Sequence, residues 1–393
     1  MTDDVAGRAE TAARTSYGRL LALLAARTHD LAGAEDALAD AFERALTRWP
    51  EDGIPDDPDA WLLTVARNRQ RDQWRSAAHR TSVPLDPDRH DVADVEPQPG
   101  DRRLDLLLLC AHPDIAPAAR VPLMLNTVLG YTAERIGLAF LVPPTTMAGR
   151  LVRAKQRIRR DDIPFEIPDA AAPERGAAVL EAVYSAYGIE WPTVSRDRHA
   201  LILGLAEVIT ETMPLVAEAH GLAALLCLSS ARLPARLDDA GLFVPLADQD
   251  PARWDKHLIA LGHRHLRAAH ALSAVGPFQL EAAINAVHCA RAAGSPPDWP
   301  ALRRLYESLH MLAPTAGGGV ALAAVIAEID GAAAGLAALD ALDGIARLQP
   351  AWVLRAHLLR RLGDAVGADD ALRRAIDLTT DPAERAHLSR RGG

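Results

Sequence analysis

The sequence predicts an all-α protein. Of its 393 residues, 49% are hydrophobic but only 4% are aromatic, and stretches in which β-branched and polar residues alternate, as in strands, are nearly absent. Ala and Leu instead recur at helical spacing along almost the whole chain. A chain of this length is expected to contain two or three domains of roughly 100–200 residues each, with a core that needs no disulfide or metal.

Charge and composition exclude several classes of protein. The 43 Lys and Arg against 52 Asp and Glu give a net charge of −9, so any contact with nucleic acid must come from local basic stripes. No apolar run approaches the ~18 uncharged residues of a membrane span, and Asp3 and Asp4 stand where a secretory signal would be basic. The three cysteines are far apart and odd in number, which argues against a disulfide framework or a zinc knuckle. We expect a reduced, cytoplasmic protein that does not contact a membrane.

The first block of predicted helices extends from about residue 15 to residue 80. Proline and glycine interrupt it at residues 49–53 and again at residues 55–58. Asp57 is placed to cap a helix and Pro58 suits the first turn of that helix, so we expect a helix to begin here and to continue through Trp61.

The helix expected over residues 35–46 has an acidic face. Such a face is suited to a protein partner rather than to DNA. A metal-binding ridge of carboxylates is the alternative, but a solvated or partner-facing surface is favoured. The acidic residues are Glu35, Asp36, Asp40 and Glu43.

The helix expected over residues 61–75 combines arginine with tryptophan. Arginines beside exposed aromatic rings suit single-stranded or melting DNA, because unpaired bases stack on the rings while guanidinium groups contact phosphates. The residues concerned are Trp61, Arg67, Arg69, Arg71, Trp74 and Arg75.

A linker is expected over residues 81–100. This stretch contains four prolines and many aspartates, a composition that does not pack and that is typical of an extended or mobile tether. Helices resume at residue 101, and this second block ends in a long basic helix near residue 160.

Residues 131–155 predict two helices joined by a tight turn. Thr145 and Thr146 are placed to cap the second helix. The residues spaced to pack inward are Ile136, Phe140, Met147 and Leu151.

The second of these helices is strongly basic. Residues 144–160 include six basic residues and no acidic one. A helix N-terminus followed by such a stripe suits the major groove of DNA, since phosphate contacts fix the register while a few side chains reach base edges. Considered alone, a basic amphipathic helix could equally be a solvated surface, and it is the arginine-rich helix at residues 61–75 that favours DNA binding.

From residue 173 to the end, the sequence predicts stacked helical hairpins. Ala-rich and Leu-rich amphipathic stretches are separated by single prolines and glycines. The last pair has the spacing of a tetratricopeptide repeat, whose period is about 34 residues, and the earlier pairs are less regular. The inward positions of the last pair are Trp352, Ala356, Leu359, Ala368, Leu372 and Ala375.

Together these blocks resemble an extracytoplasmic-function (group 4) RNA polymerase sigma factor. Residues 34–42 (AEDALADAF) are similar to the helix of sigma domain 2 that docks on core polymerase, and residues 60–68 (AWLLTVARN) to the helix that opens and reads the minus-ten promoter element. Residues 131–155 resemble the helix-turn-helix of sigma domain 4, which reads the minus-thirty-five element.

A closer likeness is to the subgroup of these sigma factors that carries a long C-terminal tetratricopeptide-like extension. The segments similar to that subgroup are residues 110–113 (CAHP), 140–143 (FLVP), 150–155 (RLVRAK), 163–165 (IPF), 248–255 (DQDPARWD) and 276–284 (GPFQLEAAI).

The resemblance implies a sigma domain 2 over residues 1–80, the linker over 81–100, a sigma domain 4 over 101–165 and the extension over 173–393. It implies no enzymatic activity and no cofactor or metal. Two partners follow, core RNA polymerase and promoter DNA, with a peptide, protein or small ligand as a further partner of the helical repeats. The implied polymerase-docking residues are Glu35, Asp36, Asp40, Phe42 and Glu43. The implied DNA-binding residues are Arg67, Asn68, Arg69, Arg71, Trp74, Arg75, Thr145, Thr146, Arg150, Arg153, Lys155 and Arg157.

The chain also departs from the family pattern. Ala39 replaces a usual Gln of the docking helix, Gly149 replaces a polar residue of the second basic helix, and the basic run after residue 75 is thin. The segment at residues 187–191 differs from the Asn-Glu-Gly-Tyr sequence of the subgroup. Lost phosphate contacts weaken affinity for DNA. An alternative hypothesis is therefore a sigma-like regulator or interaction protein that no longer initiates transcription and that binds a peptide or small ligand through its repeats.

An enzyme in the C-terminal block is the least favoured hypothesis. Several histidines cluster at residues 257–270, but they lack the spacing of a zincin metal site. The three glycines at 317–319 are not followed by a Lys, as a phosphate-binding loop would require, and no nucleophile elbow is found.

Overall fold

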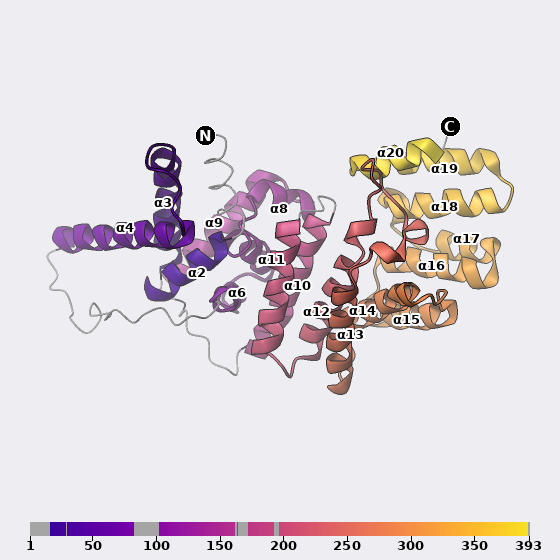
Figure 1. Ribbon diagram of the computed structural model, residues 1–393, viewed down its shortest axis with the longest axis horizontal. Coiled ribbons are helices and arrows are strands. Elements are labelled where there is room, and N and C mark those ends of the chain that lie inside the picture. Colours follow the sequence, from indigo (N-terminus) through magenta and orange to yellow (C-terminus); the bar gives the residue numbers. More distant parts are fainter. Residues whose placement is uncertain are drawn as a thin grey trace. The chain divides into compact units, whose positions relative to one another are not determined.

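The computed structural model describes residues 16–28, 30–81, 102–161, 163, 172–191 and 196–391, with the side chains at positions 27, 74, 76–81, 172–174 and 391 left out. Across these ranges the chain is helical, and its one extended feature is an isolated antiparallel bridge between Leu237 and Phe243 (Figure 1). The prediction of an all-α fold is confirmed. Nearly all of the predicted linker lies outside the described residues. No described helix is long and apolar enough to span a membrane.

The chain divides into two compact units, Met1–Ile209 and Thr210–Gly393. The first unit therefore continues past residue 173, where the sequence suggested that the extension begins. Each unit is described on its own below.

Over residues 16–81, apart from position 29, the described part of the first unit forms α2 (Tyr17–Thr28), α3 (Leu31–Asp52) and α4 (Pro58–Thr81). Asp30 caps α3 by accepting a hydrogen bond from the backbone N–H of Gly33 at 3.0 Å. The helix was expected to break at residues 49–53, but it continues through Pro50 and ends at Asp52, with Gly53 as its C-cap at a φ of 87° that few other residues adopt.

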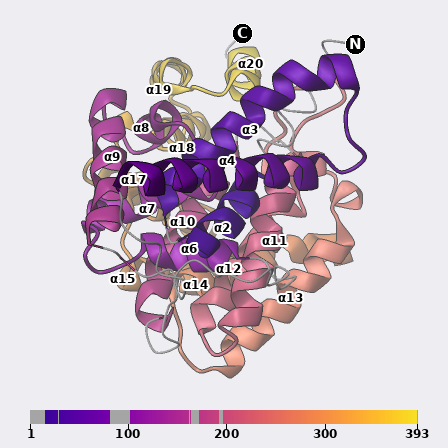
Figure 2. The same cartoon turned by 90° about the vertical axis from the view of Figure 1, so that its left-hand side faces the viewer.

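The beginning of α4 is as predicted. Oδ1 of Asp57 accepts a hydrogen bond from the N–H of Ala60 at 3.0 Å, and Pro58 is the first helical residue. Figure 2 shows α4 crossing α3, and at this crossing the rings of Trp49 and Trp61 meet edge to face with centroids 5.5 Å apart. Trp61 was predicted to be an exposed ring, but it is half-buried in this contact.

Four further helices follow, α6 (Arg103–Cys110), α7 (Pro117–Thr127), α8 (Ala133–Ala139) and α9 (Pro144–Arg160). Helices α8 and α9 are joined by a tight turn in which Leu141 has a φ of 53°. Ile136, Met147 and Leu151 are buried as predicted, whereas Phe140 ends α8 and is half-buried. Helix α10 (Ala172–Glu190) packs against α6 and α7, and α11 (Arg196–Thr212) follows it.

In the second unit, each α-helix packs on the α-helices that precede and follow it (Figure 1). Three short 3₁₀ helices lie between the first two α-helices, at Leu233–Ala235, Leu246–Asp248 and Pro251–Arg253. The α-helices are α12 (Ala217–Ser230), α13 (Lys256–Ala271), α14 (Pro277–Cys289), α15 (Trp299–Leu312), α16 (Ala316–Asp330), α17 (Ala332–Asp340), α18 (Gln349–Arg361), α19 (Ala365–Leu378) and α20 (Pro382–Arg391).

The last helical pair packs as the sequence predicts. Ala356 on α18 and Leu372 and Ala375 on α19 belong to one buried cluster, and Trp352 and Leu359 pack against it from half-buried positions. The i, i+4 and i+7 spacing of these residues places them on one face of each helix.

Candidate nucleic-acid interface

Helix α9 separates a buried apolar side from an exposed basic side. Met147, Leu151, Ala154 and Ile158 are buried at spacings of four, three and four residues. The exposed basic residues on this helix are Arg153, Arg157, Arg159 and Arg160. The expected capping role of Thr145 and Thr146 is wrong. The N-cap is Pro143, without a side-chain hydrogen bond, and both threonines are exposed in the first turn of the helix.

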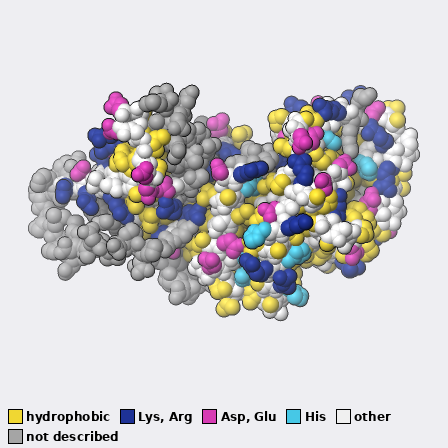
Figure 3. Space-filling view, in the orientation of Figure 1, with side chains coloured by type: hydrophobic (Ala, Val, Ile, Leu, Met, Phe, Trp, Pro, Cys, Tyr) yellow, Lys and Arg dark blue, Asp and Glu magenta, His cyan; other side chains and the backbone are white. Residues whose placement is uncertain are grey.

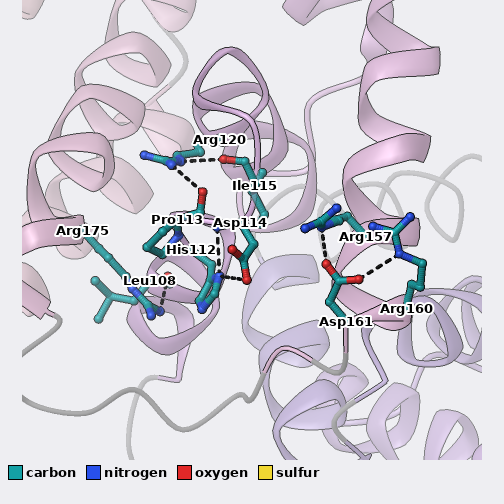
Figure 4. Close-up of polar contacts among 10 residues, drawn as sticks. All are labelled: Leu108, His112, Pro113, Asp114, Ile115, Arg120, Arg157, Arg160, Asp161 and Arg175. Atoms are coloured by element: carbon teal, nitrogen blue, oxygen red, sulfur yellow. Dashed lines mark hydrogen bonds and ion pairs between the residues drawn. The ribbon is translucent and has the colours of Figure 1, made fainter.

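Two predicted DNA-binding arginines of α9 have protein partners. Arg150 donates from Nη1 to the carbonyl oxygen of Ala118 at 3.1 Å. Arg157 forms an ion pair with Asp161, whose other oxygen accepts from Nε of Arg160 at 2.8 Å (Figure 4). The hydrogen bond from Arg160 lowers the pKa of Asp161. These pairs are exposed, and exposed ion pairs are weak, so a DNA phosphate could replace Asp161.

Polar contacts also fix the turn between α6 and α7. Arg120 donates from Nε to the carbonyl of Ile115 at 2.9 Å and from Nη2 to the carbonyl of Pro113 at 3.0 Å (Figure 4). Nδ1 of His112 accepts from the N–H of Asp114 at 3.2 Å. Partial burial and the nearby Arg175 lower the pKa of His112. The Cys-Ala-His-Pro motif at residues 110–113 therefore has a structural role in this turn.

Helix α4 presents part of its predicted DNA-binding set to solvent. Asn68, Arg71 and Arg75 are exposed. Arg69 is half-buried, with Nε 3.4 Å from Oδ2 of Asp40 on α3. Arg67 is half-buried and interacts within the protein. The side chain of Trp74 lies outside the described residues.

The acidic side of α3 is partly exposed. Asp36 and Glu43 face solvent and Phe42 is half-buried. Asp40 forms ion pairs with Arg44 at 3.2 Å and with Arg69 at 3.4 Å. Of the carboxylates predicted to dock on polymerase, Asp36 and Glu43 are thus the most accessible.

Glu35 of α3 and Lys155 of α9 form an ion pair. Oε1 and Nζ are 2.7 Å apart, and the two side chains are 17% and 22% exposed. Burial raises the pKa of Glu35, although the Lys155 ammonium group opposes this increase. The pair joins a predicted polymerase-docking residue to a predicted DNA-binding residue. Local sequence patterns could not reveal it, because 120 positions separate the two residues.

Close backbone packing accompanies this pair. Helix α2 contacts α6, and Gly18 lies so near the carbonyl group of Val128 that a Cβ at position 18 would clash with it. Tyr17 is adjacent, and burial, with a smaller contribution from Glu35, raises its pKa. The three N-terminal helices and the helices around α9 therefore pack directly on one another.

A buried charge network at Tyr131 escaped the sequence analysis. Glu190, at the end of α10, is 2% exposed and contacts Arg135 of α8 at 3.1 Å and Arg198 of α11 at 3.4 Å. Both guanidinium groups lie over the Tyr131 ring, 5.1 and 4.7 Å from its centroid. Arg198 also donates to the carbonyl of Leu129 at 2.8 Å. The sequence at residues 187–191, which differs from that of the sigma subgroup, is the feature that could have indicated this network.

Within the described part of the second unit, no helix carries as many Lys and Arg residues as α9, although α13 and α18 each have three and no acidic residue. Figure 3 shows basic and acidic side chains interspersed over its visible face. Several arginines there pair with nearby carboxylates, as Arg303 does with Glu307 and Asp330, both at 2.9 Å. On α18 all three arginines pair with carboxylates of other helices, so this helix does not present a free basic side.

Comparison with known proteins identifies two regions of the chain and one relative. Residues 13–80, which include α2, α3 and nearly all of α4, match Sigma-70 region 2. Residues 175–270 match a family of unknown function (DUF6596). An uncharacterized protein of Rhizobium meliloti (strain 1021) is 33% identical over 374 residues, which are 90% of this chain and 88% of that protein. The chain belongs to the same family as this Rhizobium meliloti protein, and it carries a sigma-70 region 2 at its N-terminus.

Proposed function

We propose that this protein is an RNA polymerase sigma factor that docks on core polymerase and directs promoter recognition and transcription initiation. The observation that carries the proposal is the match of residues 13–80 to Sigma-70 region 2. In the same residues, Asp36 and Glu43 are exposed on α3, and Arg71 and Arg75 are exposed on α4. An acidic surface for a protein partner and a basic one for DNA are the two requirements of this function.

Helix α9 would supply the second DNA contact, as the recognition helix of sigma domain 4. Its exposed arginines and its packing against α8 support this assignment. Of the predicted DNA-binding arginines on this helix, Arg153 is exposed and forms no ion pair within the described residues. Arg157 would first have to break its weak ion pair with Asp161 before it could bind a phosphate.

The C-terminal helices would regulate initiation in cis. The support for this part of the proposal is the network at Glu190, because it ties α8, next to the proposed recognition helix, to α10 and α11. We propose that the helical hairpins of the second unit are a tetratricopeptide-like extension that takes part in this regulation together with α10 and α11.

Association with purified core polymerase and run-off transcription test the proposal. Promoter fragments are selected from a genomic library by the transcripts they yield. We expect Asp36→Ala with Glu43→Ala to weaken association with core polymerase. Arg153→Ala should make the slope of log promoter affinity against log salt shallower by about 0.9, the value for one phosphate contact. Arg374→Ala, at an exposed arginine of α19, is the matched control. Absence of association with core polymerase at low salt would contradict the proposal.

A second candidate function is a sigma-like regulator that binds polymerase without initiating. The ion pair between Glu35 and Lys155 favours it, because this pair occupies one residue of each predicted surface. Polymerase binding without specific transcripts, in the wild-type protein and in Glu35→Gln alike, would identify this function.

A further inference from the structure

The second unit contains a cavity of about 460 Å³. It lies among α16, α18 and α20 and the segment that contains Phe243 and Pro245. Pockets that hold small organic molecules measure roughly 300–1,000 Å³. The cavity therefore has room for a small molecule, whereas a folded partner would need a much larger surface.

One wall of the cavity is apolar. Helix α16 contributes Val320, Ala321 and Ala324, and α18 contributes Val353 and Leu354. The small side chains of the two alanines leave the space open. This wall can accept an aliphatic or aromatic body, because apolar surface removed from water contributes about 25 cal/mol per Å².

Helix α20 adds a carboxylate to the lining, Glu384, which belongs to a cluster with more negative than positive charge. The side chain of Arg236 is 4% exposed, and its Nη2 lies 3.0 Å from Asp381 and 3.4 Å from Glu384. Only Glu384 of these three lines the cavity. One guanidinium group facing two carboxylates leaves one negative charge uncompensated within this cluster.

Aromatic contacts hold the charged cluster in place. The guanidinium group of Arg236 lies 5.7 Å from the centroid of the Phe243 ring, and that ring meets the ring of His387 edge to face at 5.8 Å. Burial, and then the charge of Asp381, raise the pKa of Glu384. A cation bound beside Glu384 would relieve this unfavourable environment.

We propose that the cavity binds a small amphipathic amine, with its ammonium group beside Glu384 and its apolar body against α16 and α18. The charge of the cluster selects a cationic head group over an anionic one. The inference names a class of ligand for the proposed regulatory extension, and the regulatory role of that ligand rests on the proposed function. Binding itself is measured without polymerase or DNA, so its failure and that of the sigma-factor proposal are distinguishable.

Titration calorimetry of the full-length protein with three ten-carbon probes tests the inference. The probes are decylamine, decanol and decanoate, which share a chain and differ in head group. We expect decylamine to bind at least tenfold more tightly than decanol, and decanoate to bind least tightly. Equal affinities, or no binding of decylamine, would overturn the proposal.

Two variants locate the site. Ala324→Leu fills the cavity and should abolish binding, and Glu384→Gln should reduce the affinity for decylamine to that for decanol. Ala337→Leu, at an exposed position of α17 that does not line the cavity, should leave all affinities unchanged. Circular dichroism checks that each variant is folded, and Ala321→Leu replaces Ala324→Leu if the latter is not. Undiminished decylamine binding in a folded cavity-filling variant would overturn the proposal.

Discussion

Glu218 fixes the beginning of a helix that lies 60 residues further along the chain. Its Oε2 accepts a hydrogen bond from the N–H of Phe278 at 2.9 Å, and its Oε1 accepts one from the N–H of Gln279 at 3.1 Å. Pro277 has no N–H to satisfy. A Cβ at Gly276 would collide with the carboxylate. The Gly-Pro-Phe motif that suggested the extended sigma subgroup thus has a structural explanation.

Replacing Gly276 with Ala should destabilise the second unit by about 1–3 kcal/mol, because the added methyl group displaces the Glu218 carboxylate from the helix N-terminus. Glu218→Ala should cost a similar amount, since two N–H groups lose their acceptor. Urea denaturation followed by circular dichroism measures both. Glu181→Ala, at an exposed position of α10, is the control. Wild-type stability in Gly276→Ala would show that the close approach is not required.

His288 should make the stability of the protein sensitive to acid. Burial, followed by the charges of Arg232 and Arg291, lowers the pKa of His288 to about 4, while the unfolded chain has a pKa near 6.5. The unfolded state therefore binds more protons between these values, and stability is lost as the pH falls through that window.

Between pH 7 and pH 5 we expect this histidine to account for a loss of about 2 kcal/mol. Urea denaturation at the two pH values measures it. His288→Gln should remove that part of the loss, whereas His310→Gln, at an exposed histidine, should not. An unchanged pH dependence in His288→Gln would contradict the assignment.

At the scale of single helices, α9 has to meet two structural requirements. Its apolar side must pack in the core, while its basic side is the proposed DNA contact. The ion pair from Lys155 to Glu35 removes one cation from that side. Helix periodicity predicted the burial of Met147 and Leu151 correctly, because it depends on local spacing alone. It could not predict which cations are already paired, because their partners come from distant parts of the chain.

Glu35→Gln should make Lys155 available to DNA. On the proposed function, the slope of log affinity against log salt should then become steeper by about 0.9, the value for one additional phosphate contact. Fluorescence anisotropy with a promoter duplex at several salt concentrations measures the slope. Asp36→Asn, which changes a neighbouring exposed carboxylate, controls for the change in net charge. Equal slopes in the two variants would indicate that Lys155 does not reach the DNA.

At the scale of the whole molecule, the sequence predicted the helical class correctly, but not how distant helices meet. The helix start at Asp57 and Pro58 follows from local capping chemistry. The burial of Trp61 against Trp49 depends on the crossing of α3 with α4, which local patterns do not encode. The same holds for Glu190, whose partners lie on α8 and α11.

Glu190→Gln should destabilise the first unit by about 3–5 kcal/mol, the usual cost of breaking a buried ion pair, because Arg198 would keep an uncompensated buried charge. Thermal and urea denaturation measure this loss. Double mutant cycles of Glu190→Gln with Arg198→Met separate the pair from the rest of the network. A loss below about 0.5 kcal/mol, as for an ordinary surface substitution, would show that the network is not a structural clamp.

The contact between Glu35 and Lys155 has a thermodynamic consequence. If the proposed function holds, a polymerase that draws Glu35 into its own interface frees Lys155, and a DNA phosphate that captures Lys155 frees Glu35. Each ligand then raises the affinity for the other by the same factor, as linkage requires. Assembly with core polymerase would then add Lys155 to the cations that contact DNA and increase the affinity of the protein for its promoters.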